Sequence, residues 1–487
     1  VLRRYLEFRG ARVLSVMNMT DVGHMVDDGA ADGSGPDKIS VAIDAAIQAQ
    51  KEEEERRKTA ESGAASMKPP DKKRGVASVQ NPNDPHQVVQ FFVDAFLEDA
   101  RALQLSIVQQ RDAMPVEQQM RIMPRPTQFI GPFIHMIQTL LDKGNAYIGT
   151  DGVVYYSVGS FPAYGRLSGN SVEQLSHGAG GRTAASAAKR HPADFFLWKP
   201  DSRHIMRWPS PWGEGYPGWH IECSSMATSL LGSSIDIHTG GEDNIFPHHE
   251  CEIAQSEAAT GQPFARVWLH NRHLMVDGKK MSKSKGNFYT IRDLVEMGFD
   301  PLAIRFALIS TRYRESMNFS LQGLQEAASA VTTLRDLADK LQTTVASIDE
   351  AAGEGATELA APEAEMISAF SAAMDDDLNI AAALGALFTW AAPLTKQKKV
   401  PFPQARSALL ALKKLDHVLA VIFPPLRPLP ADKVQQLEDL VARRNAARAA
   451  KNWAESDALR KELLGLGVEV KDTPTGTQWR PRLAPST

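Results

Sequence analysis

The spacing of apolar residues predicts two groups of helices in the chain. In the first group, apolar side chains recur every three or four residues over 88–103 and 129–141. From residue 324 onward the same spacing returns and continues almost without interruption. The helices predicted there span residues 324–348, 363–373, 379–394, 403–422, 434–450 and 453–464. The pattern therefore predicts a mixed first part of the chain and a helical second part.

Shorter apolar runs predict strands within the first 320 residues. A helix at 1–10 is followed by a buried strand at 12–17, and residues 146–148 and 153–156 predict a hairpin around Asp151-Gly152. Residues 235–238 predict another buried strand, directly after a helix at 220–231. Helices that alternate with buried strands are typical of an α/β sheet with parallel strands.

Two of these strands end in stretches suited to ligand binding. Residues 18–22 follow the first strand, and Gly240-Gly241-Glu242-Asp243 follows the strand at 235–238. In doubly wound sheets, ligands bind at the carboxyl ends of the strands. Adjacent glycines also allow the backbone to approach a ligand closely. The sequence contains no G-x-G-x-x-G, so a dinucleotide site is not supported.

Two polar segments interrupt the ordered pattern. Residues 27–85 contain the charged run 51–58, and only 39–50 predict a short helix there. The remainder lacks the apolar content that would offset the entropy of ordering, so we expect it to be largely flexible. Residues 176–190 form a second loop rich in Gly, Ala and Ser.

The totals set broad limits on the protein. Its 487 residues are enough for about three domains. No run of about 18 apolar residues occurs, so we expect no membrane contact. Two cysteines argue against a disulfide scaffold and favour a reducing compartment, and hence a cytoplasmic location. A net charge of −4 neither indicates nor excludes nucleic-acid binding, which needs only a local basic surface.

A cationic loop provides the strongest chemical signal. Lys280-Met281-Ser282-Lys283-Ser284 follows an Asp277-Gly278 turn and precedes a predicted helix near Ile291. Ammonium groups on such a loop offset the charge that develops when a phosphate is displaced from a nucleotide. The alternative is an ordinary solvated basic loop, which a lone Lys-x-x-Lys would favour.

Three further residues predict a metal site. His248 and Glu252 lie four residues apart on one predicted helix face, and Cys223 lies on another helix. Thiolate, imidazole and carboxylate are all zinc ligands, and three of them with an open position are typical of a catalytic site. The spacing leaves alternatives open, because His249 could replace His248 and Cys251 lies near the same face.

Together these motifs resemble those of the cysteinyl-tRNA synthetase family, and the lysine loop resembles the signature loop of class I aminoacyl-tRNA synthetases. The resemblance covers most of the chain outside 27–85 and 176–190. It rests on residues 18–22, 164–168, 194–199, 217–224, 236–243, 246–250, 280–284 and 457–460.

The resemblance implies a Rossmann-like class I catalytic domain, incomplete at its N-terminus, in residues 1–320, with 86–200 as a connective insertion. A helical bundle at 321–425 and a small C-terminal anticodon-binding domain at 430–487 would follow. The predicted helical hairpin of that last domain has two more basic than acidic residues over 432–482, which permits RNA contact.

The implied activity is ATP-dependent formation of cysteinyl-adenylate from L-cysteine and transfer of the cysteinyl group to tRNA(Cys). Magnesium would accompany ATP, and one zinc ion would bind the substrate thiol. By the same resemblance, the zinc ligands are Cys223, His248 and Glu252. Thr20 and Trp219 match the cysteine pocket, Gly240, Gly241 and Asp243 match the ATP site, and Lys280 and Lys283 match the phosphate-binding lysines.

The sequence departs from the family in two features. The family has a His-Ile-Gly-His motif after its first strand and a fourth zinc-ligating cysteine, and neither is present. We expect these features to belong to a segment that precedes residue 1. The alternative function is a catalytically impaired paralogue that binds tRNA. A related ligase that transfers cysteine to an amino sugar is disfavoured by the anticodon-like region. We expect a monomer.

Overall fold

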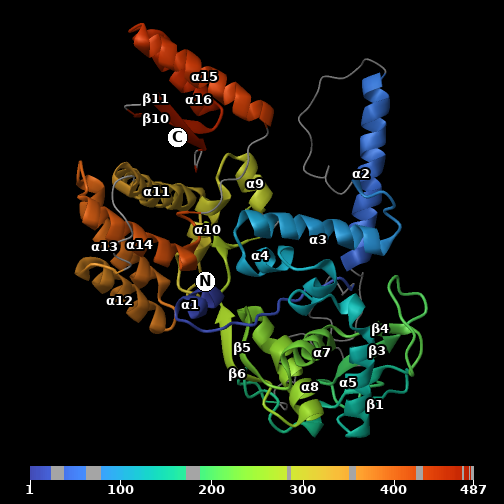
Figure 1. Cartoon of the computed structure of the whole chain (residues 1–487). Helices are drawn as coiled ribbons and strands as arrows, with labels where there is room; N and C mark the ends of the chain where they lie inside the picture. Colours follow the sequence, from blue (N-terminus) through green and yellow to red (C-terminus); the bar gives the residue numbers. More distant parts are fainter. Residues whose placement is uncertain are drawn as a thin grey trace. The chain divides into compact units, whose positions relative to one another are not determined.

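The computed structural model describes residues 1–22, 38–61, 78–171, 187–281, 287–349, 358–423, 431–473, 476–481 and 483. The chain divides into two compact units (Figure 1). Unit 1 contains Val1–Val13, Asp99–Ser106 and Arg272–Thr487, and unit 2 contains Leu14–Glu98 and Ile107–Asn271. Within the described residues, none of the helices has the length and apolar character needed to cross a membrane.

An antiparallel sheet and three helices form the main core of unit 2. The sheet order is β1 (Ala146–Ile148), β2 (Val154–Tyr156), β3 (Phe195–Pro200) and β4 (Gly215–Pro217), so the predicted hairpin is confirmed. Trp198 and Tyr156 are fully buried in this core. They belong to the same apolar cluster as residues from α5 (Ile130–Asp142), α7 (Trp219–Leu231) and α8 (Glu250–Thr260).

The strand whose carboxyl end was expected to bind a ligand belongs to a parallel pair. β5 (Ile235–Gly241) pairs with β6 (Ala265–Asn271), and α8 lies between them in sequence. The strand predicted at 235–238 is confirmed, although its burial is one-sided because Asp236 is exposed. β6 was not predicted. Its register places Trp268 opposite His238 and His270 opposite Gly240.

The strand predicted at 12–17 is absent from the described structure. α1 (Leu2–Phe8) is present as expected, but residues 11–20 form no regular element. Two backbone bonds hold the segment: Met17 N–H donates to Ile122 O at 2.8 Å, and Met19 N–H donates to Pro124 O at 2.9 Å. Residues 122–124 are themselves outside any strand, so no ladder forms and the prediction was wrong.

The polar segment contains a longer helix than expected. The short helix predicted at 39–50 is part of α2 (Lys38–Glu61). The charged run extends it because Lys, Glu and Arg are good helix formers. Ile39 and Ile43 are buried with Val88 of α3 (Pro85–Ala102). Of the segment 27–85 that was expected to be largely flexible, residues 27–37 and 62–77 lie outside the described residues, as do residues 176–186 of the loop expected at 176–190.

The remaining short elements of unit 2 are mostly single turns. α4 spans Ser106–Asp112, and a kinked turn spans Ile245–His249, within which Phe246 is extended (φ −138°, ψ 131°). Four 3₁₀ turns cover Val116–Arg121, Pro126–Gln128, Val158–Ser160 and Glu242–Asn244.

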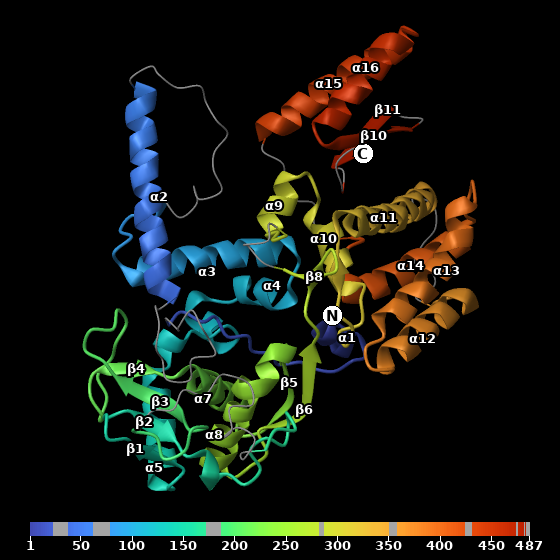
Figure 2. The same cartoon turned by 180° about the vertical axis from the view of Figure 1, so that it is seen from behind.

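Unit 1 contains the predicted helical bundle, which Figure 2 shows from behind. Its helices are α11 (Leu321–Asp349), α12 (Ala361–Asp375), α13 (Ile380–Lys396) and α14 (Phe402–Leu419), and α9 (Ile291–Glu296) and α10 (Pro301–Ile309) precede them in sequence. A small sheet has the order β8 (Lys279–Lys280), β7 (Met275–Val276) and β9 (Asn318–Phe319). α14 ends before the predicted residue 422, because Ala420 has φ 54° and the Asp416 carboxylate accepts the next backbone N–H groups.

The C-terminal part of unit 1 has a small core of its own. α15 (Ala431–Ala449) and α16 (Trp453–Gly465) form the predicted helical hairpin. A strand hairpin that was not predicted, β10 (Val468–Thr473) with β11 (Gly476–Pro481), packs beside it. Leu437, Leu463 and Val468 are buried between the helices and the strands. The domain boundaries expected from the sequence remain a prediction.

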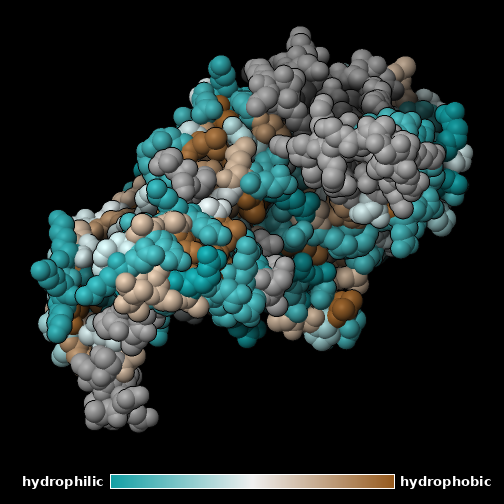
Figure 3. Space-filling view, turned by 90° about the horizontal axis from the view of Figure 1, so that it is seen from above, coloured by the Kyte–Doolittle hydropathy of each residue, from teal (hydrophilic) through white to brown (hydrophobic). Residues whose placement is uncertain are grey.

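Exposed apolar side chains are scattered over the surface. On the face drawn in Figure 3, polar residues predominate and apolar ones occur in small separate groups. Phe92, Val116 and Trp453 are among the exposed apolar residues, and they lie on different elements. Isolated apolar residues of this kind are ordinary on protein surfaces.

Candidate metal centre and active site

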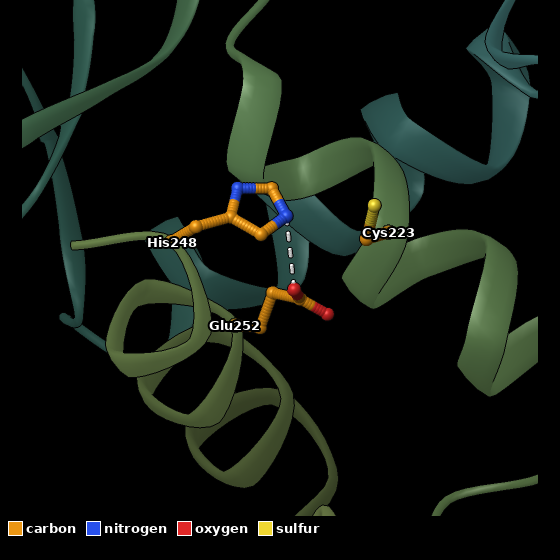
Figure 4. Close-up of side chains that lie close together, drawn as sticks. All are labelled: Cys223, His248 and Glu252. Atoms are coloured by element: carbon orange, nitrogen blue, oxygen red, sulfur yellow. Dashed lines mark ion pairs between the residues drawn. The ribbon is translucent and has the colours of Figure 1, made fainter. Parts of the chain in front are cut away.

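Three metal-ligand side chains converge in unit 2, as Figure 4 shows. Cys223 comes from α7, His248 from the kinked turn Ile245–His249, and Glu252 from the first turn of α8. Their ligand atoms all lie within 4.8 Å of one another, and His248 Nε2 is 3.0 Å from Glu252 Oε1. Ligands about 2.1 Å from a tetrahedral zinc ion lie about 3.4 Å apart. The spacing therefore fits a zinc site with one position left open.

The Glu252 carboxylate lies in an environment that favours a bound cation. It is fully buried, and neither oxygen accepts a well-aligned hydrogen bond from the part of the chain that the structure describes. Burial alone would raise the pKa of Glu252, but the charges of His238 and His248 hold that pKa well below its usual range. Because a buried carboxylate is costly without partners, a metal ion between Glu252 and its neighbours fits this donor set.

A second group of possible ligands shares the same carboxylate. His238 Nε2 lies 3.4 Å from Glu252 Oε2, and His249 Nε2 lies 4.0 Å from Glu252 Oε1. Burial lowers the pKa of His249 to about 3, so its imidazole is neutral. A Cβ on Gly240 would lie 2.6 Å from His249 Cε1, which means that His249 packs directly on that glycine. The choice between His248 and His249 that the sequence left open therefore stays open in the geometry.

Cys251 is in neither ligand group. Its side chain is buried, and its Sγ lies 3.4 Å from the Tyr164 hydroxyl. Burial raises the pKa of the Cys251 thiol well above its ordinary value. Burial also raises the pKa of Cys223, and the charges of Glu252 and Glu222 raise it further. Of the two thiols, only Cys223 faces the group that could bind a cation and so favour the thiolate.

His248 is oriented by aromatic and imidazole neighbours. Its Nδ1 lies at hydrogen-bond distance, 2.8 Å, from His220 Nδ1, which leaves Nε2 directed at Glu252. The ring centroid of Trp219 is 4.1 Å from that of His248. A ligand histidine is commonly held through its other ring nitrogen in this way. Trp219, which was expected in the cysteine pocket, therefore lies against the candidate metal centre.

Three histidines of this network, His220, His238 and His270, were not predicted as part of the site from the sequence. His220 is three residues before Cys223 on α7, so it shares the same helix face. His270 Nε2 is 2.8 Å from His249 Nδ1, and His238 lies beside both because β5 and β6 pair in register. The spacing of His220 and Cys223 could have revealed the first, whereas the other two needed the strand pairing.

The motif at 164–168 is held by the same helix that carries Glu252. The buried Glu250 carboxylate accepts Gly165 N–H at 3.0 Å and Ser168 N–H at 2.6 Å. Gly165 has φ 94°, and a Cβ there would lie 1.8 Å from Asn170 O. The motif therefore forms a tight loop that Glu250 fixes against α8.

The other predicted site residues lie in several places. Gly240 and Gly241 end β5, and Asp243 follows in a 3₁₀ turn, with its Oδ1 2.3 Å from where a Cβ on Gly241 would be. Thr20 is exposed and accepts a hydrogen bond from Asn18 Nδ2 at 3.3 Å. Lys280 is exposed on β8 of unit 1. Lys283 lies outside the described residues.

Comparison with known proteins decides the family. The catalytic domain described as tRNA synthetases class I (C) matches residues 1–329, and a DALR domain matches 369–423. The cysteinyl-tRNA ligase anticodon binding domain matches residues 432–480. The chain belongs to the cysteinyl-tRNA synthetase family. The resemblance expected from the motifs and the expected fold class are thereby confirmed.

Individual relatives agree with the domain matches. Cysteine–tRNA ligase of Symbiobacterium thermophilum is 38% identical over 98% of this chain and 89% of its own length. The cysteine–tRNA ligase of Salinibacter ruber is 36% identical over 99% of this chain and 89% of its own. That of Pseudomonas paraeruginosa is 46% identical over 73% of this chain and 75% of its own. The likeness to this family of aminoacyl-tRNA synthetases therefore extends over nearly the whole chain.

Proposed function

We propose that this protein is a cysteine–tRNA ligase, which activates L-cysteine with ATP and transfers the cysteinyl group to tRNA(Cys). Family membership supports the reaction class. The observation that carries the choice of amino acid is the convergence of Cys223, His248 and Glu252 in a buried position beside Trp219. Side chains of this kind suit a site that selects its substrate by sulfur.

A zinc ion held by Cys223, His248 and Glu252 would supply a position that binds the thiolate of cysteine far better than the hydroxyl of serine. Trp219 and Thr20 would bound the substrate side of that position. His220 keeps the His248 ring oriented through the 2.8 Å contact between their Nδ1 atoms. A site built on one strong polar contact rejects an analogue without it much more effectively than shape alone can.

Backbone and lysine groups are assigned to the nucleotide. Gly240, Gly241 and Asp243 lie at the carboxyl end of β5, where a nucleotide can approach the backbone closely. Lys280 and Lys283 would offset charge on the phosphates of ATP, which binds with Mg²⁺, while the cysteine carboxylate attacks the α-phosphate and pyrophosphate leaves. We expect Lys283→Ala to raise the adenylation barrier by roughly 3 kcal/mol, because this lysine is one of several stabilising groups. An unchanged single-turnover rate would exclude it.

The C-terminal domain is assigned to tRNA. A hollow of about 540 Å³ lies between α15 and β11, lined by Val441, Asn445, Thr477 and Trp479 among others. An indole beside amide and hydroxyl groups can stack on an unpaired base and bond to its edge. We further propose that the protein acts in the cytoplasm as a monomer.

Metal analysis combined with cysteine-dependent ATP–pyrophosphate exchange tests this function in the full-length protein. We expect about one zinc per chain and exchange that rejects serine by about 10⁴-fold or more. Cys223→Ser should lose zinc and exchange, whereas the matched variant Cys251→Ala should keep both, because the Cys251 Sγ is in neither ligand group and lies 3.4 Å from the Tyr164 hydroxyl.

Three outcomes would contradict the proposal. Exchange that persists in metal-free Cys223→Ser would remove zinc from substrate selection. Equal loss in Cys251→Ala would assign the effect to folding. Tight tRNA binding without any exchange in the full-length protein would favour the non-catalytic paralogue.

A further inference from the structure

Arg480 joins the C-terminal domain to the long helix α11. From β11 its guanidinium reaches two carboxylates of that helix, with Nη2 2.7 Å from Asp336 Oδ1 and Nη1 3.1 Å from Asp339 Oδ2. The third guanidinium nitrogen, Nε, bonds to Glu469 of β10 at 2.5 Å. Lys471 Nζ approaches Asp336 at 3.9 Å. The strand hairpin therefore presents two cations to one acidic face of α11.

The chain that follows β11 makes a second, independent attachment. Leu483 is 6% exposed and belongs to the large apolar core of the helical bundle. Its carbonyl accepts the backbone N–H of Asp300 at 2.9 Å. Asp300 is the N-cap residue of α10, and its side chain accepts Leu302 N–H at 2.8 Å. An apolar anchor and a backbone hydrogen bond thus connect the C-terminal segment to the start of α10.

We propose that Arg480 and Leu483 form a latch, which holds the C-terminal domain on the bundle so that tRNA bound there is presented correctly to the catalytic domain. The latch is defined by these two residues with Asp336, Asp339 and Asp300. This inference rests on the proposed function, because it assigns tRNA to the C-terminal domain. It concerns how that domain is positioned and leaves amino-acid activation to other residues.

The geometry of α11 makes it a suitable platform. Asp336 and Asp339 lie three residues apart and so share one helix face. Leu334, Leu337 and Leu341 are buried in the bundle core on the same turns. The carboxylates are therefore carried on a rigid element whose other face is fixed by packing. Single exposed ion pairs contribute little, but one guanidinium shared by three carboxylates and accompanied by an apolar anchor defines an orientation.

The bond between Leu483 and Asp300 connects the latch to the part of the chain that follows the lysine loop. α9 begins at Ile291, shortly after the lysine loop, and α10 begins at Pro301. Leu483 therefore bonds to the short connection between the two helices that follow that loop. The latch is expected to matter for tRNA charging, which needs the two ends of one tRNA to be bound together, and not for adenylate formation, which needs no tRNA.

The test uses the carboxylates of α11, because they cannot bind tRNA phosphates themselves. In the full-length protein, Asp336→Asn combined with Asp339→Asn should leave cysteine-dependent exchange within about twofold of the parent. The KM for tRNA in charging should rise by about fivefold or more. Arg480→Gln should have the same two effects, an unchanged cysteine-dependent exchange and a raised KM for tRNA. Lys413→Ala, which removes an exposed cation from α14, is the matched control and should change neither reaction.

A charge exchange separates the latch from direct tRNA contact. Arg480→Glu combined with Asp336→Arg and Asp339→Lys should recover charging relative to Arg480→Glu alone, and hydrogen exchange of the β11 amides should return toward the parent rate. If Arg480 bound phosphate directly, the reversed charges in the triple variant would not restore charging. The Asn variants of Asp336 and Asp339 would then leave the KM for tRNA unchanged or lower it. Either result would overturn the latch. If the parent protein itself showed no cysteine-dependent pyrophosphate exchange, the proposed function would be contradicted instead.

Discussion

Two carboxylates in this molecule each lie between two potentially cationic side chains, and they differ in what those neighbours are. Glu252 of unit 2 has His248 at 3.0 Å and His238 at 3.4 Å. Asp472 of the C-terminal domain has Arg444 and Arg448, each at 2.6 Å. Glu252 is fully buried, whereas the Asp472 side chain is 39% exposed. The neighbours of the first can be neutral, and those of the second are always charged.

The hydrogen bonds show what this difference means for function. Arg444 binds both oxygens of Asp472, at 2.6 and 3.1 Å, and Thr477 Oγ1 donates to Asp472 Oδ1 at 2.9 Å. The carboxylate is satisfied by these groups, and guanidinium groups cannot ligate a metal. Glu252 accepts no aligned hydrogen bond within the described ranges, and its imidazole and thiol neighbours are metal ligands. One arrangement is therefore structural, and the other is suited to hold a cation.

Two of the basic residues on the C-terminal helices are bound within their own domain. Arg444 is 2% exposed, and its charge is directed into its own domain at Asp472. Arg448 binds the same carboxylate. Counting charges along the sequence therefore overstates the surface that the hairpin offers to RNA.

The largest expected effect is a loss of zinc affinity and cysteine activation, and it should distinguish His248 from His249 as the ligand beside Glu252. We expect His248→Gln to lower zinc affinity and cysteine activation by about 100-fold, because it removes a ligand that lies 3.0 Å from Glu252. His249→Gln should retain the metal, since His249 Nε2 is 4.0 Å from the carboxylate and packs on Gly240. Metal content and pyrophosphate exchange measure both, with the exposed His135→Gln as control. The reverse order of effects would place the ion in the group formed with His238.

A smaller effect is expected for the buried arginine of the other cluster. Arg444→Met should lower the free energy of unfolding of the C-terminal domain by about 2 kcal/mol, because it removes charge-assisted bonds while the half-exposed Asp472 can be solvated. Chemical denaturation followed by Trp479 fluorescence measures this loss. The neighbouring Arg443→Met, at an exposed position, provides the control. Cysteine-dependent exchange should be unaffected, and a simultaneous loss of zinc would show that the clusters are not independent.

The smallest effect concerns pH. The hydrogen bonds from Arg444 lower the pKa of Asp472 from 3.8 to about 2. This stabilisation is fully present above pH 4 and is lost as the pH falls toward 2, because the unfolded chain then binds the proton more tightly. Since Asp472 is 39% exposed, solvent screening limits the contribution to about 1 kcal/mol or less. Asp472→Asn should flatten the acid limb of the unfolding curve by that amount, and an unchanged limb would contradict the assignment.

Amphipathic spacing correctly predicted most of the helices but did not predict several of the strands. α11 to α16 lie close to where apolar spacing predicted them, because each has one face committed to a core. β6 and the β10–β11 hairpin were missed, and the expected strand at 12–17 is irregular. Strands depend on a partner elsewhere in the chain, so a short apolar run is a weak predictor of a ladder.

The sequence alone indicated the family of this protein, the helices of the bundle and a ligand pair of Glu252 with a neighbouring histidine, His248 or His249, since all three follow from local spacing and motifs. Only the tertiary structure decided that Cys223 joins that pair while Cys251 turns to Tyr164, and that His238 reaches the same carboxylate from a strand. It also decided that Arg444 is an internal residue and that Arg480 reaches α11. The physical reason is that these contacts depend on how separate elements pack, which short-range periodicity does not specify.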